Sequence, residues 1–351
     1  MEEDYPAFGP SANSGPEKPA IWKTGGVGSA VLDRAPRLLP SLLAVLVVSG
    51  AIMVAAPSRA AVPSQNRFFY SGDGQIELVS KKNGRSFSGR YRNGAQGYDE
   101  AALAAICRLF DVPADAPPSE LSLRLLEYLD FLQDRFRKAA KITVTSGYRS
   151  PEYNTGVRRR GGLAAKASLH QYGMAADIEM EGVPARRIWQ TVKGLKYGGA
   201  GYYHGDTVHI DVGPARSWDE TTSGVGTGIS DDNKLVGLVA DFDRYRPGDV
   251  VTLRFIRMTA FPIGVAPEFA LDRLDGSGGA ETAVAFTPSL RVASAAACPQ
   301  FEDIDQMASI QWRLPAGLPA GRYAVRARFC GGDWEKMPPA VVTPAFEVLR
   351  P

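Results

Sequence analysis

Apolar residues recur at every third or fourth position in several segments of the first two thirds of the chain, the spacing that places them on one face of a helix. The longest such segment predicts a helix over residues 119–138, with Ser119 as its N-cap. Leu121, Leu125, Tyr128 and Leu132 form its apolar face. Shorter helices are predicted over residues 99–109 and 184–195 in the same way.

Short β-branched and aromatic runs between these segments predict strands. They cover residues 68–70 and 75–79 around a Gly72–Gly74 turn, residues 141–146, and a hairpin of residues 198–203 and 207–212. Because helices and strands alternate through residues 61–219, we predict one α+β domain there.

The pattern changes after residues 220–232, a segment rich in Thr, Ser and Gly that is typical of a linker. In residues 233–351 apolar and polar positions alternate, for example at Val251, Leu253 and Phe255, and Pro-Gly turns separate the runs. This predicts a small all-β sandwich domain. The sandwich contains no catalytic constellation, so contact with a polymer or a protein partner, or no role beyond folding, all stay open.

The N-terminal segment carries targeting information. Residues 1–33 have the composition of a disordered tail. In residues 34–60, Arg34 and Arg37 precede an apolar run over residues 38–56, and small residues follow near Ala60. This order predicts a secretory signal. Since a run of about 18 apolar residues also suffices for a membrane span, an uncleaved inner-membrane anchor is the alternative. Both interpretations predict export.

Charge and cysteine content narrow the classes of protein. The formal net charge is only +2, without a basic cluster interleaved with aromatic residues, so nucleic acid is not a predicted partner. Cys298 and Cys330 are a candidate disulfide pair in an oxidising compartment, whereas Cys107 lies in an apolar helical pattern and is expected to be a buried thiol.

The three histidines of the chain are His170, His204 and His209, all within 40 residues of one another. His170 is followed by Asp177 across the small residues Gly173 and Ala175, and His209 lies in a predicted strand. A His/Asp/His donor set suits zinc, and three protein ligands leave one position of a tetrahedral ion for water. The pattern predicts a site for one zinc ion in a hydrolase.

The segments around these residues resemble the zinc D-Ala-D-Ala carboxypeptidase family, nearest its periplasmic murein endopeptidase branch. The resemblance rests on Ser168-x-His-x-x-Gly-x-Ala-x-Asp177, on Ser146-Gly-Tyr-Arg-Ser150 before it, and on His209-x-Asp-x-Gly213 after it. It implies the hedgehog/DD-peptidase fold, a zinc held by His170, Asp177 and His209, and peptidoglycan as substrate. It covers roughly residues 65–219, and the C-terminal sandwich lies outside it.

Two carboxylates are candidates for the general base. The position of Asp206, three residues before His209, matches that of an acidic base in relatives. Asp211 shares the strand face of His209, so it is a candidate base or a partner of the imidazole. The sequence favours Asp206 slightly and leaves both open.

Three further side chains are candidates for supporting roles. Arg149 matches an arginine that such enzymes use beside the zinc, to stabilise an oxyanion or bind a substrate carboxylate. Ser168 is interpreted as a brace of the loop or a substrate contact, and His204 as an exposed residue or a transition-state partner.

The leading hypothesis is therefore an exported zinc peptidase that opens peptide cross-links of peptidoglycan in the periplasm. The alternatives are a carboxypeptidase that trims terminal D-Ala from the same polymer, and a wall-binding module with a structural zinc. The sequence does not decide the bond cleaved, the oligomeric state or the fate of the apolar segment.

Overall fold

The computed structural model describes residues 67–94, 97–113, 120–159, 165–221, 232–290, 297–332 and 334–350. The predicted tail and signal or anchor segment, residues 1–33 and 34–60, lie outside the described residues, as does most of the predicted linker. None of the helices in the described ranges has the length and apolar character needed to cross a membrane.

A seven-stranded sheet organises the first part of the described chain, up to residue 221. Its strand order is β2-β1-β3-β4-β6-β5-β7, with parallel pairing between β1 and β3 and between β5 and β7 and antiparallel pairing elsewhere. The strands are β1 (Gln75–Ser80), β2 (Ser86–Arg90), β3 (Ile142–Ser146), β4 (Ala175–Met180), β5 (Gly199–Tyr202), β6 (Val208–Asp211) and β7 (Arg216–Asp219).

The sheet confirms the predicted strand at 75–79, the strand at 141–146 and the terminal hairpin. The predicted strand at 68–70 is wrong, because these residues form bends. Phe68 is nevertheless buried, and Phe69 donates its backbone N–H to Asp243. A short aromatic run that packs into a core therefore does not have to pair with a neighbouring strand.

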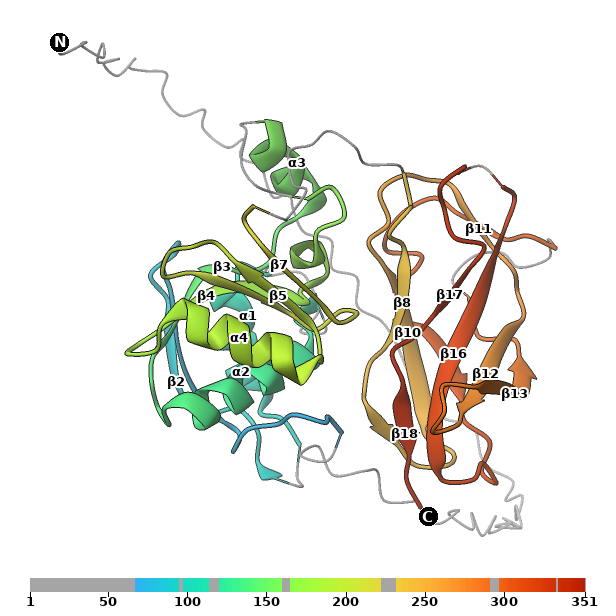
Figure 1. Cartoon of the computed structure of the whole chain (residues 1–351), viewed down its shortest axis with the longest axis horizontal. Helices are drawn as coiled ribbons and strands as arrows, with labels where there is room; N and C mark the ends of the chain where they lie inside the picture. The colour runs from blue at the N-terminus through green and yellow to red at the C-terminus, as the bar shows by residue number, and fades with distance from the viewer. Residues whose placement is uncertain are drawn as a thin grey trace, which may run out of the picture. The chain divides into compact units, whose positions relative to one another are not determined.

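Helices α1 (Glu100–Leu109), α2 (Leu123–Phe136), α3 (Pro151–Arg159) and α4 (Ala185–Leu195) and the 3₁₀ helix η4 (Leu169–Tyr172) complete this part. Asp99 caps α1 by accepting a hydrogen bond from the Ala102 amide at 2.8 Å. Helix α2 begins after Ser122, later than predicted, and the expected cap Ser119 lies outside the described residues. Helix α4 packs against β5 and β6, and α2 against β1 (Figure 1).

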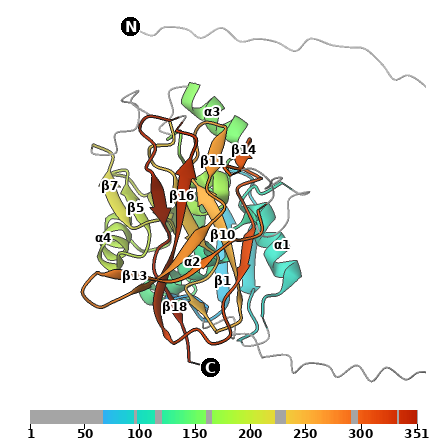
Figure 2. The same ribbon diagram turned by 90° about the vertical axis from the view of Figure 1, so that its right-hand side faces the viewer.

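Every element after residue 236 in the described ranges is a strand, as the alternating pattern predicts. A three-stranded sheet has the order β15-β10-β8, formed by β15 (Ile310–Arg313), β10 (Val250–Ile256) and β8 (Gly237–Ala240). The predicted inward residues Val251, Leu253 and Phe255 of β10 are all fully buried. Figure 2 faces these C-terminal strands, with the long β16 (Gly321–Cys330) near the middle.

The larger C-terminal sheet has eight strands built around β16. The others are β9 (Arg244–Tyr245), β11 (Ile263–Val265), β12 (Phe269–Leu274), β13 (Ala280–Phe286), β14 (Gln300–Phe301), β17 (Ala340–Val342) and β18 (Phe346–Val348). Cys298 and Cys330 form a disulfide, which confirms that candidate pair, and Cys107 is buried.

Buried polar contacts join the two parts of the described chain. Arg124 of α2 forms an ion pair with Asp243 at 2.8 Å, and both side chains are nearly inaccessible to solvent. The described residues of Arg59–Pro351 form one compact unit. The predicted division into a domain at 61–219, a linker at 220–232 and a domain at 233–351 therefore stays a prediction.

Candidate metal centre

Strand register places two of the candidate zinc ligands opposite one another. Strands β4 and β6 are antiparallel, and Asp177 is the direct cross-strand partner of His209. Side chains at directly opposed positions lie on the same face of a sheet and come close together. His170 is on η4, the short helix that leads into β4, so the motif supplies its first ligand from the turn before the strand.

The donor atoms of these three residues converge. The Nδ1 atom of His209 lies 3.0 Å from Oδ1 of Asp177 and 3.3 Å from Nε2 of His170. Nε2 of His170 is 3.5 Å from the same Asp177 oxygen. One ligand atom from each residue lies within 4.8 Å of the others, and all three residues are buried. Two imidazole nitrogens and a carboxylate oxygen at such spacing fit a zinc ion.

The opposite nitrogen of each imidazole is held by a second group. Nδ1–H of His170 donates to the backbone carbonyl of Gly147 at 2.7 Å, and Nε2–H of His209 donates to Oδ2 of Asp211 at 2.9 Å. These bonds fix the ring orientations and leave the inward nitrogens with their lone pairs for a metal. The surroundings of the donor set therefore also fit zinc.

The charges of the site shift the pKa of each of the three candidate ligands. Burial raises the pKa of Asp177, but His170 and His209 outweigh this effect, and the net pKa lies well below its ordinary value. Burial lowers the pKa of His170, and Asp177 offsets only part of the change. For His209 burial also lowers the pKa, but hydrogen bonds to Asp177 and Asp211 raise it above the ordinary value. An ionised Asp177 and a neutral His170 are the forms that bind a metal.

Gly173 determines how the chain turns from η4 into β4. Its φ of 59° lies in the left-handed region, and its amide donates to the His170 carbonyl at 3.3 Å. A Cβ at this position would overlap the backbone carbonyl of Glu120. Glycine alone satisfies both conditions without strain. The small residue in the motif thus allows β4 to begin directly after the His170 helix.

Arg149 lies beside the candidate ligands but is engaged with one of them. Its guanidinium donates to Oδ2 of Asp177 at 2.8 Å and to the Ser146 hydroxyl at 2.9 Å. Its amide donates to the His170 carbonyl at 3.1 Å. The structure therefore brings Arg149 to the site, where it orients the carboxylate that faces the two imidazoles.

Asp211 contacts the His209 ring on the side opposite to the other two candidate ligands. Besides His209 Nε2, the carboxylate accepts hydrogen bonds from the amides of Gly199 and Gly213 and forms an ion pair with Arg216 at 2.6 Å. It is completely buried. Burial raises its pKa, but Arg216 and His209 outweigh this effect, and the net pKa lies well below the ordinary value. Of the two roles expected for Asp211, the geometry favours the partner of the imidazole.

The other predicted site residues lie farther out. Asp206 is exposed in the turn before β6 and does not belong to the strand that carries His209. His204 is exposed with a φ of 57°, and its ring lies tilted against that of Tyr202, with the centroids 4.7 Å apart. Neither is among the cavity-lining residues, whereas Ser168, the N-cap of η4, does line the cavity.

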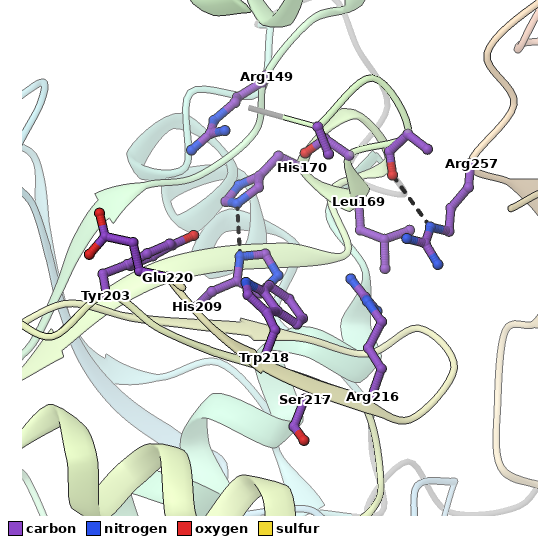
Figure 3. A pocket seen from close by; sticks show the side chains of 13 residues that line it. Arg149, Leu169, His170, Tyr203, His209, Arg216, Ser217, Trp218, Glu220 and Arg257 are labelled. Carbon is purple, nitrogen blue, oxygen red and sulfur yellow. Dashed lines mark hydrogen bonds between the residues drawn. The ribbon is translucent and has the colours of Figure 1, made fainter. Parts of the chain in front are cut away.

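A cavity of about 250 Å³ opens over the two imidazoles (Figure 3). Sequence reasoning missed six polar or aromatic residues of its lining: Tyr203, Arg216, Ser217, Trp218, Glu220 and Arg257. Tyr203 donates to Oδ1 of Asp177 at 3.4 Å, and the Trp218 ring lies 5.0 Å from that of His209. The position of Arg216 and Trp218 just after the His-x-Asp-x-Gly segment is a local signal that could have found them. Glu220 and Arg257 carry no such signal.

Known proteins that resemble this chain identify its family. The family model described as peptidoglycan L,D-endopeptidase MepK matches residues 72–218. The Escherichia coli (strain K12) protein of that name is 34% identical over 145 residues, which span 41% of this chain and 79% of the relative. The chain belongs to the MepK family. The resemblance inferred from the motifs is thereby confirmed, and the protein is a peptidase by family.

Other MepK relatives give the same assignment. A Haemophilus influenzae protein named probable peptidoglycan L,D-endopeptidase MepK is 40% identical over 80 residues, 22% of this chain and 43% of that protein. Among solved structures, Spo0M, a sporulation control protein from Bacillus subtilis, matches with a TM-score of 0.20 and 12% identity over 35% of this chain and 50% of that one. The score is too low for an argument. The MepK match contains all three candidate ligands and ends before Glu220 and Arg257.

Proposed function

We propose that the protein is a zinc-dependent endopeptidase that hydrolyses peptide cross-links of bacterial peptidoglycan. The observation that carries the proposal is the convergence of His170, Asp177 and His209 beneath a cavity, in a chain of the MepK family. The names of the relatives support a bond between an L- and a D-centre as the bond that is cleaved.

In this proposal His170, Asp177 and His209 hold one zinc ion. The ion would polarise the scissile carbonyl and lower the pKa of water. Arg149 keeps Asp177 oriented through its 2.8 Å contact, and Asp211 keeps the His209 ring oriented. Both are positioning residues, because each acts through a ligand.

A carboxylate has to accept a proton and deliver it to the leaving amine. Glu220 is the one carboxylate among the described residues that line the cavity, and its amide donates to the Tyr202 carbonyl at 2.8 Å, next to Tyr203 (Figure 3). Asp206, which the sequence favoured, is exposed, as Glu220 is, but it lies outside the lining. We assign the proton transfer to Glu220 and retain Asp206 as the competing candidate.

The proposed substrate lies outside the cytoplasm, so the enzyme is exported. The Cys298–Cys330 disulfide supports an oxidising compartment such as the periplasm. The signal or membrane anchor predicted at residues 34–60 belongs to this proposal, as does a protein partner for the C-terminal strands.

The test incubates the exported chain with cross-linked muropeptide dimers, once with zinc and once after chelation of the metal. Mass spectrometry then identifies the products. We expect zinc-dependent conversion of dimers to monomers. His170→Ala and His209→Ala should each lower the rate at least about 100-fold while circular dichroism stays unchanged. Release of alanine alone would establish the carboxypeptidase instead. Bound zinc and bound polymer without any cleavage would establish a wall-binding module.

A further inference from the structure

Arg257 reaches the candidate active site from the C-terminal strands. It follows β10 directly, and among the described residues that line the cavity it alone comes from beyond residue 232. Its backbone adopts a φ of 63°, which is uncommon for a residue with a side chain. Figure 3 shows its side chain extending toward the region of Leu169 and Arg216.

Hydrogen bonds attach this segment to the helix that carries His170. The Met258 amide donates to the buried Tyr172 hydroxyl at 3.1 Å, and Arg254 donates to the Tyr172 carbonyl at 3.2 Å. Arg257 itself donates Nε–H to the Ala167 carbonyl at 3.4 Å. Because the contacts lie on both sides of Arg257, its position is defined relative to η4.

The charge of Arg257 is not neutralised by an ion pair with any carboxylate in the described ranges. The other two arginines of the cavity do have such partners: Arg149 pairs with Asp177 and Arg216 with Asp211. Burial and repulsion from Arg216 lower the pKa of Arg257 to about 10, and attraction from Asp211 offsets only part of this change. The side chain therefore remains a cation at neutral pH, in a half-buried place where an anion would be stabilised.

We propose that Arg257 binds a carboxylate of the peptide substrate, so that the C-terminal strands form part of the substrate-binding site. The proposal rests on the proposed function, because the peptide stems of peptidoglycan end in a free carboxylate. Nε donates to Ala167, and within the described part of the chain neither terminal amino group of the guanidinium has a hydrogen-bond partner, so both can bind a carboxylate. This contact would select among stems by their charge, separately from the chemistry at the zinc ligands.

The test measures binding of an intact substrate to the zinc-free full chain by isothermal titration calorimetry. One ligand is a cross-linked dimer with free C-terminal carboxylates, and the other is the same dimer with those groups amidated. We expect the acid form to bind about tenfold more tightly, the effect of one hydrogen-bonded charge. Arg257→Gln should remove this preference by lowering the affinity for the acid form alone. The control Arg322→Gln changes an exposed arginine of β16 outside the cavity and should preserve it.

The proposal would be overturned if Arg257→Gln lowered the affinity for both dimers equally, or if the wild type bound both dimers equally well. Arg257 would then serve only to hold η4 in place. If Arg257→Gln does not fold, Arg257→Lys retains the charge without the paired donors and should show a reduced preference. Failure of the proposed function looks different. The zinc-loaded chain would then cleave neither dimer, while binding still depended on Arg257 and on the free carboxylate.

Discussion

At the scale of single residues, Asp211 is a buried carboxylate that would support the proposed zinc site without being a ligand. It holds Nε2–H of His209 and is itself held by Arg216 and two backbone amides. Asp211→Asn should lower zinc affinity by about 10- to 100-fold, because the neutral amide orients the imidazole less firmly and makes it less basic.

A competition titration against a chromophoric chelator measures this change, and Asp206→Asn is the matched control at an exposed position of the same hairpin. Unchanged affinity in Asp211→Asn, with the thermal unfolding temperature preserved, would show that His209 needs no such partner.

The assignment of the proton acceptor makes a second prediction at this scale. Glu220→Gln should lower kcat by about 100-fold or more and leave zinc affinity unaltered, since a general base contributes about 100- to 10,000-fold. Asp206→Asn should change kcat by no more than about twofold. Steady-state kinetics on the muropeptide dimer distinguishes the two variants, and the reverse ranking would return the role to Asp206.

At the scale of elements, the turn that ends η4 restricts the sequence most strongly, because its backbone conformation and close packing require glycine. Gly173→Ala should destabilise the protein by at least about 1 kcal/mol, because it combines an unfavourable positive φ with a clash against the Glu120 backbone. It should also weaken zinc binding by displacing His170.

The control is Gly194→Ala near the end of α4, where an added Cβ would meet nothing within 4 Å. This change should stabilise the protein by about 0.5 to 1 kcal/mol, since alanine is the better helix former. Urea unfolding measures both. A Gly173→Ala variant as stable as the wild type would mean that η4 tolerates another turn.

The elements also show what a sequence can predict. Helices α1, α2 and α4 have clear apolar periodicity, and each lies within the segment that the pattern predicts, although α2 begins four residues later. Strand β4 (Ala175–Met180) was not predicted although polar Asp177 and Glu179 alternate with apolar residues, because Asp177 was interpreted only as part of the ligand motif. Strand β7 was not predicted because its sequence, Arg-Ser-Trp-Asp, contains no β-branched residue and only one aromatic residue.

The candidate site likewise contains residues that the sequence predicts and residues that it does not. The ligands His170, Asp177 and His209 lie within one motif and one hairpin, so local spacing sufficed to find them. Glu220 follows the last strand of the sheet, and Arg257 comes from a different sheet. Only tertiary packing brings those two side chains to the cavity, and no pattern within a single segment records that packing.

At the scale of the whole molecule, Asp130 makes stability depend on pH. This carboxyl of α2 is fully buried and accepts from the Tyr91 hydroxyl and the Gly74 amide through Oδ2, while Oδ1 has no partner in the described structure. Burial raises its pKa from 3.8 to about 7. The folded state therefore binds the proton more tightly than the unfolded state does.

Its contribution to stability is complete below about pH 4 and is lost as the pH rises to about 7. Asp130→Asn should flatten the pH dependence of the unfolding free energy in this window. At pH 8 it should stabilise the protein by up to about 4 kcal/mol, since one pKa unit corresponds to about 1.4 kcal/mol. Chemical unfolding from pH 4 to 8 tests this. The exposed Glu181→Gln should keep the wild-type slope, and an equal slope in Asp130→Asn would contradict the expectation.

The contact between Trp218 and His209 has an optical consequence. Gly201, the cross-strand partner of His209, leaves room for the indole, because a Cβ there would come within 2.6 Å of it. An indole this close to a candidate ligand ring experiences a different electric field when that imidazole binds an ion. The intrinsic emission of Trp218 should therefore shift as metal is taken up, and Trp218→Phe should abolish the shift. Metal binding could then be followed by the fluorescence of the protein itself, without a dye or label.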